Sequence, residues 1–434
     1  MKFYSTNGQS RNVSLEEVVM TGLAPDGGLF LPERFPVIPR AFFNNMGEMT
    51  VRDIAYVVAN TMLGEDIDSA ELREIVNDTF TFDIPLRHIH DNVYSLELYH
   101  GPTLAFKDVG ARFLARIISH YSKKMTGEIN VLVATSGDSG GAVASGFHKV
   151  PGVNVYVLYP ERVLSAMQKH QFVSLGDNIH PIEVLGNFDD CQRIAKEAFN
   201  DLDLRARMHL TSANSINVCR MIPQMFYYFY GYADLLRQNP DVHDVVVAVP
   251  SGNLGNLTAG LSAKIMGLPI KRFVAANNRN DVFTQYLATG SFAPRQSVRT
   301  LACAMDVGNP SNFSRILEMY HHDHTAMCAD INGYTLTDRE IADTMVDVHS
   351  IHNYLLDPHG ATAYKALEMD LRDGETGIFL ETAHPSKFAK TMREVTGVEF
   401  PEPKTVTPQR IHPNEIQRIS PSHAALKKIL LNAT

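Results

Sequence analysis

The sequence has few cysteines, and none of them are paired in a motif. The four cysteines, Cys191, Cys219, Cys303 and Cys328, are far apart and form no CxxC pattern. This spacing indicates neither a disulfide framework nor a cysteine zinc site. It is typical of a protein of the reducing cytoplasm, which is the location we expect.

An excess of positive charge and long apolar runs are also missing. Lys and Arg number 39 against 48 Asp and Glu, so the net charge of -9 gives no general attraction to nucleic acid or anionic membranes. The start, Met1 to Ser5, turns polar at once instead of leading into an apolar secretory signal. No run approaches the length of a membrane span. We expect no nucleic-acid or membrane partner, although a local anion site is still allowed.

What is present is an ordinary globular composition. With 434 residues, 44% hydrophobic and 20% charged, the chain can bury several cores, and disorder, collagen-like sequence and coiled coil are disfavoured. Short β-rich runs alternate with amphipathic stretches after a Gly- and Pro-containing, mainly helical beginning that includes Val51 to Leu63. The predicted strands are Val93 to Leu98, Ile129 to Ala134, Val153 to Tyr159, Ile182 to Leu185, Val245 to Val249, Phe273 to Ala276 and Ile378 to Leu380.

Several of these runs are apolar throughout, as expected for parallel strands that are covered on both faces. The sequence therefore predicts an α/β fold. One helix is expected around Val109 to Tyr121, where apolar residues repeat every four positions. Prolines after Pro401 predict an extended surface segment to Pro421, before a last helix around Ala424 to Leu431.

Two loops share one pattern, in which an apolar strand leads into glycines and small polar residues and then into a helix. They are Thr135 to Gly141 and Pro250 to Asn256. Glycine allows close backbone approach, and the N–H groups at a helix start attract anions, so both loops could cradle an anion. Neither contains GxGxxG or GxxxxGK[ST], which disfavours a Rossmann site and a P-loop. The alternative is a pair of tight turns without a ligand.

A lone lysine, Lys107, follows an apolar run at the start of a predicted helix. The positive helix end and partial desolvation would lower its pKa and make the neutral amine available for a Schiff base. The alternative is a surface lysine beside Asp108, a residue that suits the first turn of a helix.

Other polar clusters allow both a functional and a structural interpretation. In Asn214 to Arg220, the guanidinium could hold a phosphate or carboxylate, or the cluster could cap a helix from Met221 to Tyr232. Met305 to Asn312 could line a cleft or form turns before a helix at Phe313.

Two further segments contain residues that commonly bind ligands. His321 to His324 runs consecutively and does not align three side chains on one face, so a solvated loop is favoured and no metal site is predicted. Thr382 follows the last predicted strand, at the sheet edge where such folds bind ligands, and could hydrogen-bond a ligand nitrogen.

Taken in order, these segments closely resemble the threonine synthases, pyridoxal 5'-phosphate (PLP) enzymes of the tryptophan-synthase-β-like fold (fold type II). The early Pro25 to Leu29 element resembles the longer bacterial and fungal branch. The matching stretches are Pro25 to Leu31, Gly101 to Asp108, Thr135 to Ala142, Asn214 to Arg220, Ser251 to Asn256, Ala304 to Phe313, Asp357 to Ala361 and Glu381 to Phe388.

The resemblance implies two open, mainly parallel sheets flanked by helices, plus a small, mainly helical N-terminal region. It implies an N-terminal region over residues 1–90 and a stretch 91–240 that includes the smaller, mobile α/β domain and the Lys107 segment. The large PLP-binding domain would cover 241–400, and a C-terminal extension 401–434.

The resemblance also implies roles for individual residues. Lys107 would hold PLP covalently, Thr382 would lie beside the pyridine nitrogen, and Asp138 would lie near the cofactor's 3-oxygen. Many relatives have Asn at that position, and a carboxylate there would repel the phenolate and the substrate carboxylate unless it is protonated or turned away. The cofactor phosphate would be cradled by Ser251, Gly252, Asn253, Leu254, Gly255 and Asn256. The substrate would be bound by Thr135, Ser136 and Ser139 at its carboxylate and by Asn214, Ser215 and Arg220 at its phosphate, with Asn256 near both phosphates.

The implied reaction converts O-phospho-L-homoserine and water into L-threonine and phosphate, with Lys107 moving protons and Arg220 neutralising the departing phosphate. We expect a monomer or weak homodimer. Two alternatives stay open: another PLP lyase of this fold, such as a threonine or serine dehydratase, and a non-catalytic anion-binding relative.

Overall fold

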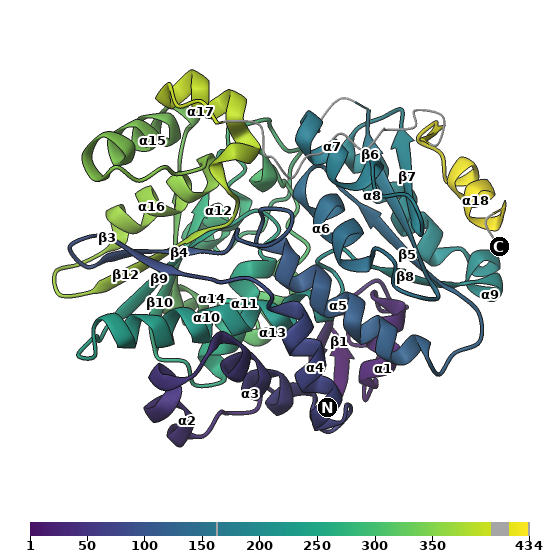
Figure 1. Cartoon of the computed structure of the whole chain (residues 1–434), viewed down its shortest axis with the longest axis horizontal. Coiled ribbons are helices and arrows are strands. Elements are labelled where there is room, and N and C mark those ends of the chain that lie inside the picture. The colour runs from purple at the N-terminus through teal and green to yellow at the C-terminus, as the bar shows by residue number, and fades with distance from the viewer. Residues whose placement is uncertain (162–163, 401–415, 433–434) are drawn as a thin grey trace. The chain divides into compact units, whose positions relative to one another are not determined.

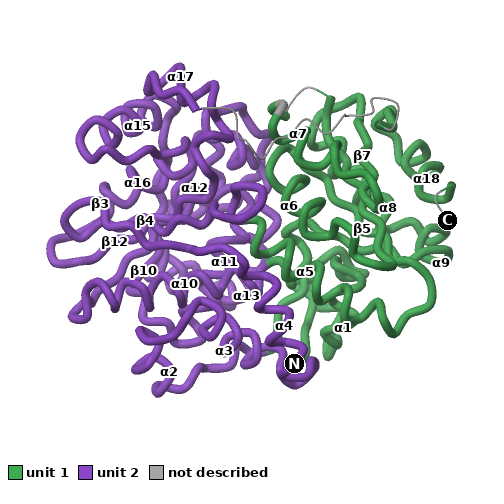
Figure 2. The backbone as a smooth tube through the Cα atoms, in the orientation of Figure 1, with its two compact units in different colours: residues 1–33, 107–220, 402–434 green, residues 34–106, 221–401 purple. Residues whose placement is uncertain are grey.

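The computed structural model describes residues 1–161, 164–400 and 416–432 (Figure 1). The chain divides into two compact units, each assembled from separate stretches of sequence (Figure 2). Unit 1 comprises Met1–Glu33, Lys107–Arg220 and Glu402–Thr434, and unit 2 comprises Arg34–Phe106 and Met221–Pro401. The domain boundaries expected from the sequence stay a prediction.

Unit 1 is built on a five-stranded sheet in which every neighbouring pair is parallel, in the order β13-β7-β6-β5-β8. The strands are β5 (Ile129–Ala134), β6 (Val153–Pro160), β7 (Ile179–Val184), β8 (His209–Ser212) and β13 (Gln417–Ile419). All six residues of β5 are buried, as its mostly apolar run predicts for a strand covered on both faces.

Helices pack against this sheet, and a small antiparallel pair, β1 (Phe3–Ser5) with β2 (Phe30–Pro32), lies at the beginning of the chain. The helices of unit 1 are α1 (Leu15–Thr21), α5 (Lys107–Ser122), α6 (Asp138–Phe147), α7 (Ala166–Val173), α8 (Phe188–Asn200), α9 (Leu202–Arg207) and α18 (His423–Asn432). Leu426 and Leu430 of α18 are fully buried in the same apolar cluster as Leu132 of β5 and Ile194 of α8. The C-terminal helix is therefore part of the core of unit 1.

Unit 2 contains a six-stranded sheet of order β11-β10-β9-β12-β4-β3, which is parallel except for the antiparallel β3–β4 pair at one edge. The strands are β3 (Leu86–His90), β4 (Val93–Glu97), β9 (Val245–Pro250), β10 (Ile270–Asn277), β11 (Ile331–Thr335) and β12 (Thr376–Glu381).

The helices of unit 2 cover both faces of this sheet. The α-helices are α2 (Arg40–Asn45), α3 (Val51–Leu63), α4 (Ser69–Thr79), α10 (Val218–Gln238, which begins in unit 1), α11 (Gly255–Ile265), α12 (Val282–Thr289), α13 (Phe313–Met319), α14 (His324–Asp330), α15 (Asp338–His352), α16 (Pro358–Asp370) and α17 (Ala389–Thr396). Single 3-10 turns are η1 (Met46–Glu48), η2 (Cys303–Met305) and η3 (Pro385–Phe388).

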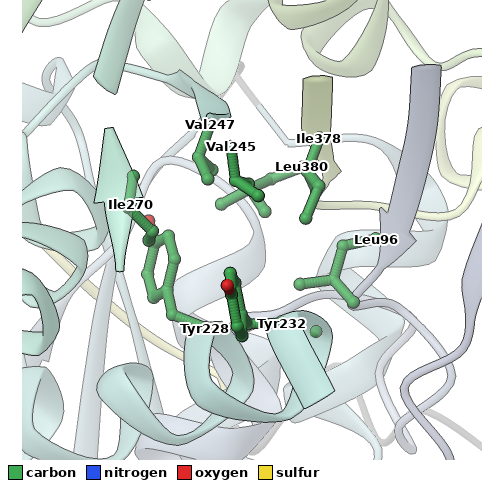
Figure 3. A pocket seen from close by; sticks show the side chains of 9 residues that line it. Leu96, Tyr228, Tyr232, Val245, Val247, Ile270, Ile378 and Leu380 are labelled. Atoms are coloured by element: carbon green, nitrogen blue, oxygen red, sulfur yellow. The ribbon is translucent and has the colours of Figure 1, made fainter. Parts of the chain in front are cut away.

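Successive side chains of the central strands point to opposite faces of the sheet, and each face packs against different helices. Val246 and Ala248 of β9 join a buried cluster with Ala363 and Leu367 of α16. Residues of the opposite parity line a small apolar cavity on the α10 side (Figure 3). The cavity is lined by Leu96, Tyr228, Gly231, Tyr232, Val245, Val247, Ile270, Ile378 and Leu380. Glu381 has the parity of Phe379, which belongs to the α16 cluster, so its side chain is directed to the α16 face.

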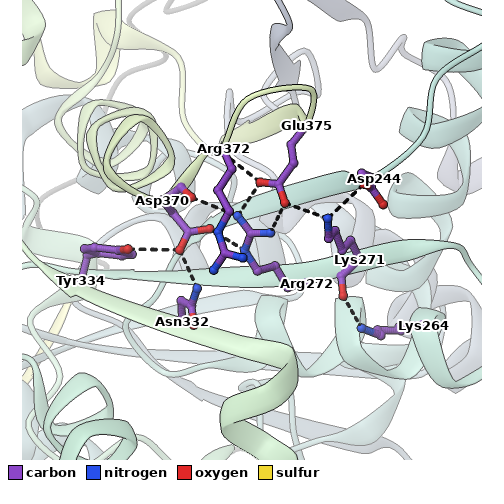
Figure 4. A network of polar contacts seen from close by, with 9 residues as sticks. All are labelled: Asp244, Lys264, Lys271, Arg272, Asn332, Tyr334, Asp370, Arg372 and Glu375. Carbon is purple, nitrogen blue, oxygen red and sulfur yellow. Dashed lines mark hydrogen bonds and ion pairs between the residues drawn. The ribbon is translucent and has the colours of Figure 1, made fainter.

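A buried ion-pair network joins β10 to the end of α16 and the start of β12 (Figure 4). The Arg272 guanidinium donates to both carboxylate oxygens of Glu375 at 2.6 Å and to Asp370 Oδ2 at 2.7 Å. All three residues are buried, and Lys271 adds a second ion pair to Glu375 at 2.9 Å. Bonds from Arg272, then from Lys271, hold the pKa of the Glu375 carboxyl at about 2, against the effect of burial.

The α/β fold with two mainly parallel sheets and an N-terminal region containing helices is confirmed. The seven strands predicted from the sequence all occur, with ends shifted by at most three residues, and Val51–Leu63 forms α3 without any shift. The helix expected from Met221 to Tyr232 is longer at both ends. Val218 to Arg220 already form its first turn, and it continues to Gln238. Of the extended segment expected from Pro401 to Pro421, residues 401–415 lie outside the described residues, and Gln417–Ile419 pair with β7. No helix within the described ranges is long and apolar enough to cross a membrane.

Candidate active site

Lys107 opens helix α5, and the loop before it is fixed to the segment that follows β12. The backbone N–H of Phe106 donates to the Thr382 carbonyl oxygen at 2.9 Å, and the N–H of His384 donates to Leu104 O at 3.0 Å. Leu104 takes a left-handed backbone conformation with φ of 59°, which turns the chain between these two bonds. The residue preceding Lys107 is therefore anchored beside Thr382, a residue predicted to meet the cofactor.

A second lysine supports the same loop. Lys387 is 3% exposed, and its ammonium group donates to the Thr103 carbonyl oxygen at 2.6 Å. A buried ammonium group requires such an acceptor, and this one lies four residues before Lys107. Lys387 lies in the Glu381 to Phe388 stretch, but no role was predicted for it, because nothing local indicates a partner 284 positions away.

The loop after β5 in unit 1 is organised by the Thr135 hydroxyl. Thr135 Oγ1 donates to Gly137 O at 2.9 Å and accepts from the N–H groups of Gly137 at 3.1 Å and Gly140 at 2.9 Å. Because Thr135 is buried and its hydroxyl is engaged three times, its observed role is to shape the turn. Ser136 and Ser139, on either side of Asp138, are half-buried.

Asp138 is the first residue of α6 and is 4% exposed. Gln168 Nε2 donates to Asp138 Oδ1 at 3.1 Å, and Gln168 is itself held by a capping box with Ser165 at the start of α7. One oxygen of this carboxylate is thus turned towards an amide donor of its own unit.

The Asn214 to Arg220 cluster lies between β8 and α10. The Asn214 amide pairs with the backbone of Ala134, accepting from its N–H at 3.1 Å and donating to its carbonyl at 2.8 Å. Asn214 therefore joins the end of β5 to this cluster, while Ser215 is half-buried.

Arg220 is 3% exposed, and its Nη1 donates to Ala213 O at 2.5 Å. A Cβ atom at Gly110 would lie 2.9 Å from Arg220 Nε, so only a glycine lets the guanidinium stem pass this turn of α5. Gly110 stands one helical turn after Lys107, and the structure thus brings Arg220 against the beginning of the Lys107 helix.

The second Gly-containing loop, after β9 in unit 2, is tightly fixed at its start. Ser251 is buried, its N–H donates to Ala276 O at 2.8 Å, and its hydroxyl donates to Val249 O at 2.8 Å. Leu254 is left-handed, with φ of 61°, and directs the chain into α11, which begins at Gly255. The loop therefore presents the start of an eleven-residue helix, which favours an anion.

Asn256 places a buried donor without a partner in this loop. It is 6% exposed, and the hydroxyls of Tyr227 and Tyr228 both lie 2.7 Å from its Oδ1. These contacts fix the amide orientation, and Asn256 Nδ2 has no hydrogen-bond partner in the described structure. A buried donor of this kind normally has an acceptor. The residues present thus fit an oxyanion such as a phosphate.

Thr382 and Glu381 lie at the end of β12. Thr382 is 6% exposed, and Glu381 is fully buried, with Oε1 accepting from the Asp357 N–H at 3.1 Å and Oε2 without a partner in the described structure. Burial, and then repulsion from Asp357, raise the pKa of the Glu381 carboxyl well above its usual range. Sequence reasoning did not single out Glu381, because its environment comes from an element outside its own motif.

His322 and His324 of the histidine tract form hydrogen bonds to other groups of the protein. His322 Nε2 lies 2.9 Å from Glu318 Oε1, and His324 Nε2 lies 3.0 Å from the carbonyl oxygens of Tyr286 and Leu287. No group of His, Cys, Asp or Glu residues in the described ranges is arranged to hold a metal ion.

The two mainly parallel sheets flanked by helices, a lysine at the start of α5 and a glycine-containing loop at the start of α11 are features of a PLP-dependent α/β enzyme, and similarity to known proteins agrees. Residues 82–377 match the family described as "Pyridoxal-phosphate dependent enzyme", and residues 2–80 match "Threonine synthase N terminus". The chain is 40% identical to threonine synthase of Haemophilus influenzae over 433 residues, which cover 100% of both chains.

Solved structures give the same result. The crystal structure of threonine synthase from Escherichia coli has a TM-score of 0.92 at 36% identity and covers 100% of both chains. A PLP-bound threonine synthase from Brucella melitensis has a TM-score of 0.91 at 31% identity, covering 100% of this chain and 99% of that one. The chain belongs to the threonine synthase family of PLP-dependent lyases, and the resemblance stated from its motifs is confirmed.

Proposed function

We propose that the chain converts O-phospho-L-homoserine and water into L-threonine and inorganic phosphate. The supporting observation is the match to threonine synthases along the whole chain, including a separate N-terminal match over residues 2–80. Threonine or serine dehydration and ligand binding without catalysis are the competing functions, and the experiments below separate them.

Lys107, Thr382 and the Ser251 to Asn256 loop would hold the cofactor. PLP, when bound, stabilises negative charge at the substrate's Cα. Ser251, Gly252, Asn253, Leu254, Gly255 and Asn256 would bind its phosphate through backbone N–H groups and Asn256 Nδ2. Thr382 would hydrogen-bond the pyridine nitrogen, and Asp138 would lie near the 3-oxygen with Gln168 as its neighbour.

Lys107 would also move protons, because its amine is the basic group of the cofactor segment. Its Nζ would accept the proton from the substrate's Cα and return protons later in the reaction. The three backbone and side-chain bonds that fix residues 103 to 106 support this role, since proton transfer depends on a well-placed base.

The substrate's two anionic groups would be bound by unit 1. Thr135, Ser136 and Ser139 would surround the α-carboxylate, and Asn214, Ser215 and Arg220 the phosphate, with Asn256 of unit 2 near both phosphates. A buried guanidinium suits an oxyanion and would neutralise charge on the departing phosphate. The side chains of Thr135 and Asn214 also form hydrogen bonds with backbone groups, so we propose that they shape these loops as well.

The deciding experiment follows phosphate and threonine release from O-phospho-L-homoserine in parallel. Equal yields are expected, whereas a 2-keto acid in place of threonine would indicate a dehydratase. Arg220→Ala should reduce turnover strongly while leaving PLP binding intact, and unchanged turnover would contradict the substrate assignment.

Lys107→Ala should remove both turnover and the visible absorption band of lysine-bound PLP. Lys390→Ala is the control, since the Lys390 side chain is 81% exposed. A wild-type protein that binds PLP without this band would favour the non-catalytic alternative.

We further propose a cytoplasmic location, supported by the four separated cysteines and the absence of a membrane-spanning helix in the described ranges. A monomer or weak homodimer is proposed for the assembly, and sedimentation velocity over a range of concentrations measures it.

A further inference from the structure

A buried acid and imidazole pair stands at the beginning of α16. Asp357 caps the helix, and its Oδ1 accepts from the Gly360 N–H at 2.8 Å, while its Oδ2 is hydrogen-bonded to His359 Nδ1. Asp357 is fully buried and His359 is 2% exposed. Neither residue has a part in the function proposed above, so the pair calls for another explanation.

The hydrogen bonds of His359 determine where its ring carries the proton. The backbone N–H of Ala304 donates to His359 Nε2 at 3.1 Å, so Nε2 offers a lone pair. The single ring proton is therefore on Nδ1 and is donated to Asp357. Asp357 thus fixes both the tautomer and the direction of the ring, with its acceptor nitrogen aimed at Ala304.

Ala304 and Met305 form the surface against which Gly252 of the anion-binding loop packs. A Cβ atom at position 252 would lie 2.8 Å from Met305 Cα and 3.3 Å from Ala304 O. No side chain fits there, so the two backbones are in direct contact. A displacement of residues 304–305 would therefore displace Gly252 as well.

The other end of the same segment supports the next residue of the loop. The Ser311 N–H donates to Asn253 Oδ1 at 2.6 Å, and Asn312 Nδ2 donates to Asn253 O at 2.9 Å. Residues 304 to 312 thus hold Gly252 and Asn253 at two places. His359 accepts a hydrogen bond from the Ala304 end.

We propose that His359 is a positioning residue for the cofactor phosphate: fixed by Asp357, it accepts the Ala304 N–H and holds residues 304–305 against Gly252. The proposal rests on the proposed role of Ser251 to Asn256 as the phosphate loop. His359 does not itself touch the phosphate, and it acts through the backbone of Ala304 and Met305.

The test compares two substitutions that each keep one of the two hydrogen bonds. The His359→Gln amide oxygen reaches the position of Nε2 and can still accept from Ala304. The His359→Asn amide reaches only the position of Nδ1, keeps Asp357 and leaves the Ala304 N–H without an acceptor. We expect His359→Asn to raise the Kd for PLP about 10-fold, the scale of one buried hydrogen bond, and His359→Gln to raise it less.

Affinity for pyridoxal, which lacks the phosphate, separates positioning from general damage. His359→Asn should leave the Kd for pyridoxal unchanged and shift the phosphorus resonance of bound PLP. If PLP and pyridoxal are weakened equally, or if both variants bind PLP like the wild type, the proposal is wrong. His322→Asn is the control, since that side chain is 64% exposed.

Failure of the phosphate-loop assignment would give a different result. Asn256→Ala should reduce the preference for PLP over pyridoxal, because Nδ2 is the buried donor of the loop. If Asn256→Ala keeps the full preference for PLP, the loop assignment fails. If Asn256→Ala loses that preference but both His359 variants bind PLP like the wild type, only the positioning role is refuted.

Discussion

Phe106 and Thr382 are joined by a backbone hydrogen bond of 2.9 Å, although they are 276 positions apart in the chain. One precedes the proposed cofactor lysine, and the other is the residue proposed to meet the pyridine nitrogen. Because the bond uses backbone atoms, it is independent of the side chain at either position. It fixes the backbone of Phe106 relative to the end of β12.

Lys387→Met should weaken the support of this loop. The substitution keeps a long side chain but removes the ammonium that donates to Thr103 O, leaving a buried carbonyl without its donor. We expect a loss of about 1–3 kcal/mol in unfolding free energy and slower formation of the lysine-bound PLP band. Denaturant unfolding and rapid-mixing absorbance measure these effects, with the exposed Lys390→Met as control. Wild-type rates in Lys387→Met would contradict the supporting role.

Glu381→Gln should make the folded protein more stable at neutral pH. The pKa of the Glu381 carboxyl is raised in the folded state. At a pH above the usual glutamate pKa, the unfolded chain has lost this proton, so folding has to take it up again. The stability that depends on this proton is complete at acidic pH and is lost as pH rises, by up to about 1.4 kcal/mol per pH unit. Glutamine is uncharged at all pH values and removes this dependence.

The measurement for Glu381 is unfolding free energy between pH 5 and pH 8, a range of about three units above the usual glutamate pKa. Glu368→Gln is the matched control, because that side chain is 49% exposed. A variant whose stability falls with pH as steeply as the wild type would show that Glu381 is ionised in the folded protein.

Arg272→Met should destabilise unit 2 strongly. The substitution leaves Asp370 and Glu375 buried without their main cation, and removing one partner of a buried ion pair costs about 3–5 kcal/mol. Arg339→Met serves as control, since its side chain is 90% exposed. Urea unfolding measures both, and equal midpoints would refute the importance of the network.

The same network predicts acid sensitivity. The folded pKa of Glu375 is depressed to about 2, so its contribution is present above the usual glutamate pKa and is lost as pH falls towards 2. In Arg272→Met this part of the acid-dependent loss should be smaller, because the depressing partner is gone. An unchanged acid profile would contradict this assignment.

The local features of the fold were predictable because their causes are local. β5 and α3 were predicted with their observed bounds, since a mostly apolar run and a three-to-four residue repeat act within the segment itself. Short edge strands such as β11 (Ile331–Thr335) were missed, because only one of its five residues is buried. Their pairing depends on a neighbour that local periodicity does not reveal.

The sequence named candidate site residues but could not name their contacts. Lys107, Thr382 and the two Gly-containing loops were selected as candidates from composition and motif order, and their roles stay predictions. The bonds from Lys387 to Thr103 and from Ala304 to His359 join positions 284 and 55 apart. Such contacts are set by tertiary packing, and Asn214, predicted to bind substrate, was found pairing with the backbone of Ala134 for the same reason.

The interleaved composition of the two units has a consequence for synthesis on the ribosome. Unit 1 draws its core from Leu132 near the first third of the chain and from Leu426 and Leu430 at its end. That core is completed only after translation has almost finished, whereas unit 2 has all its strands once Glu381 has emerged. A nascent chain stalled before α18 should therefore expose the apolar surface of unit 1 to chaperones.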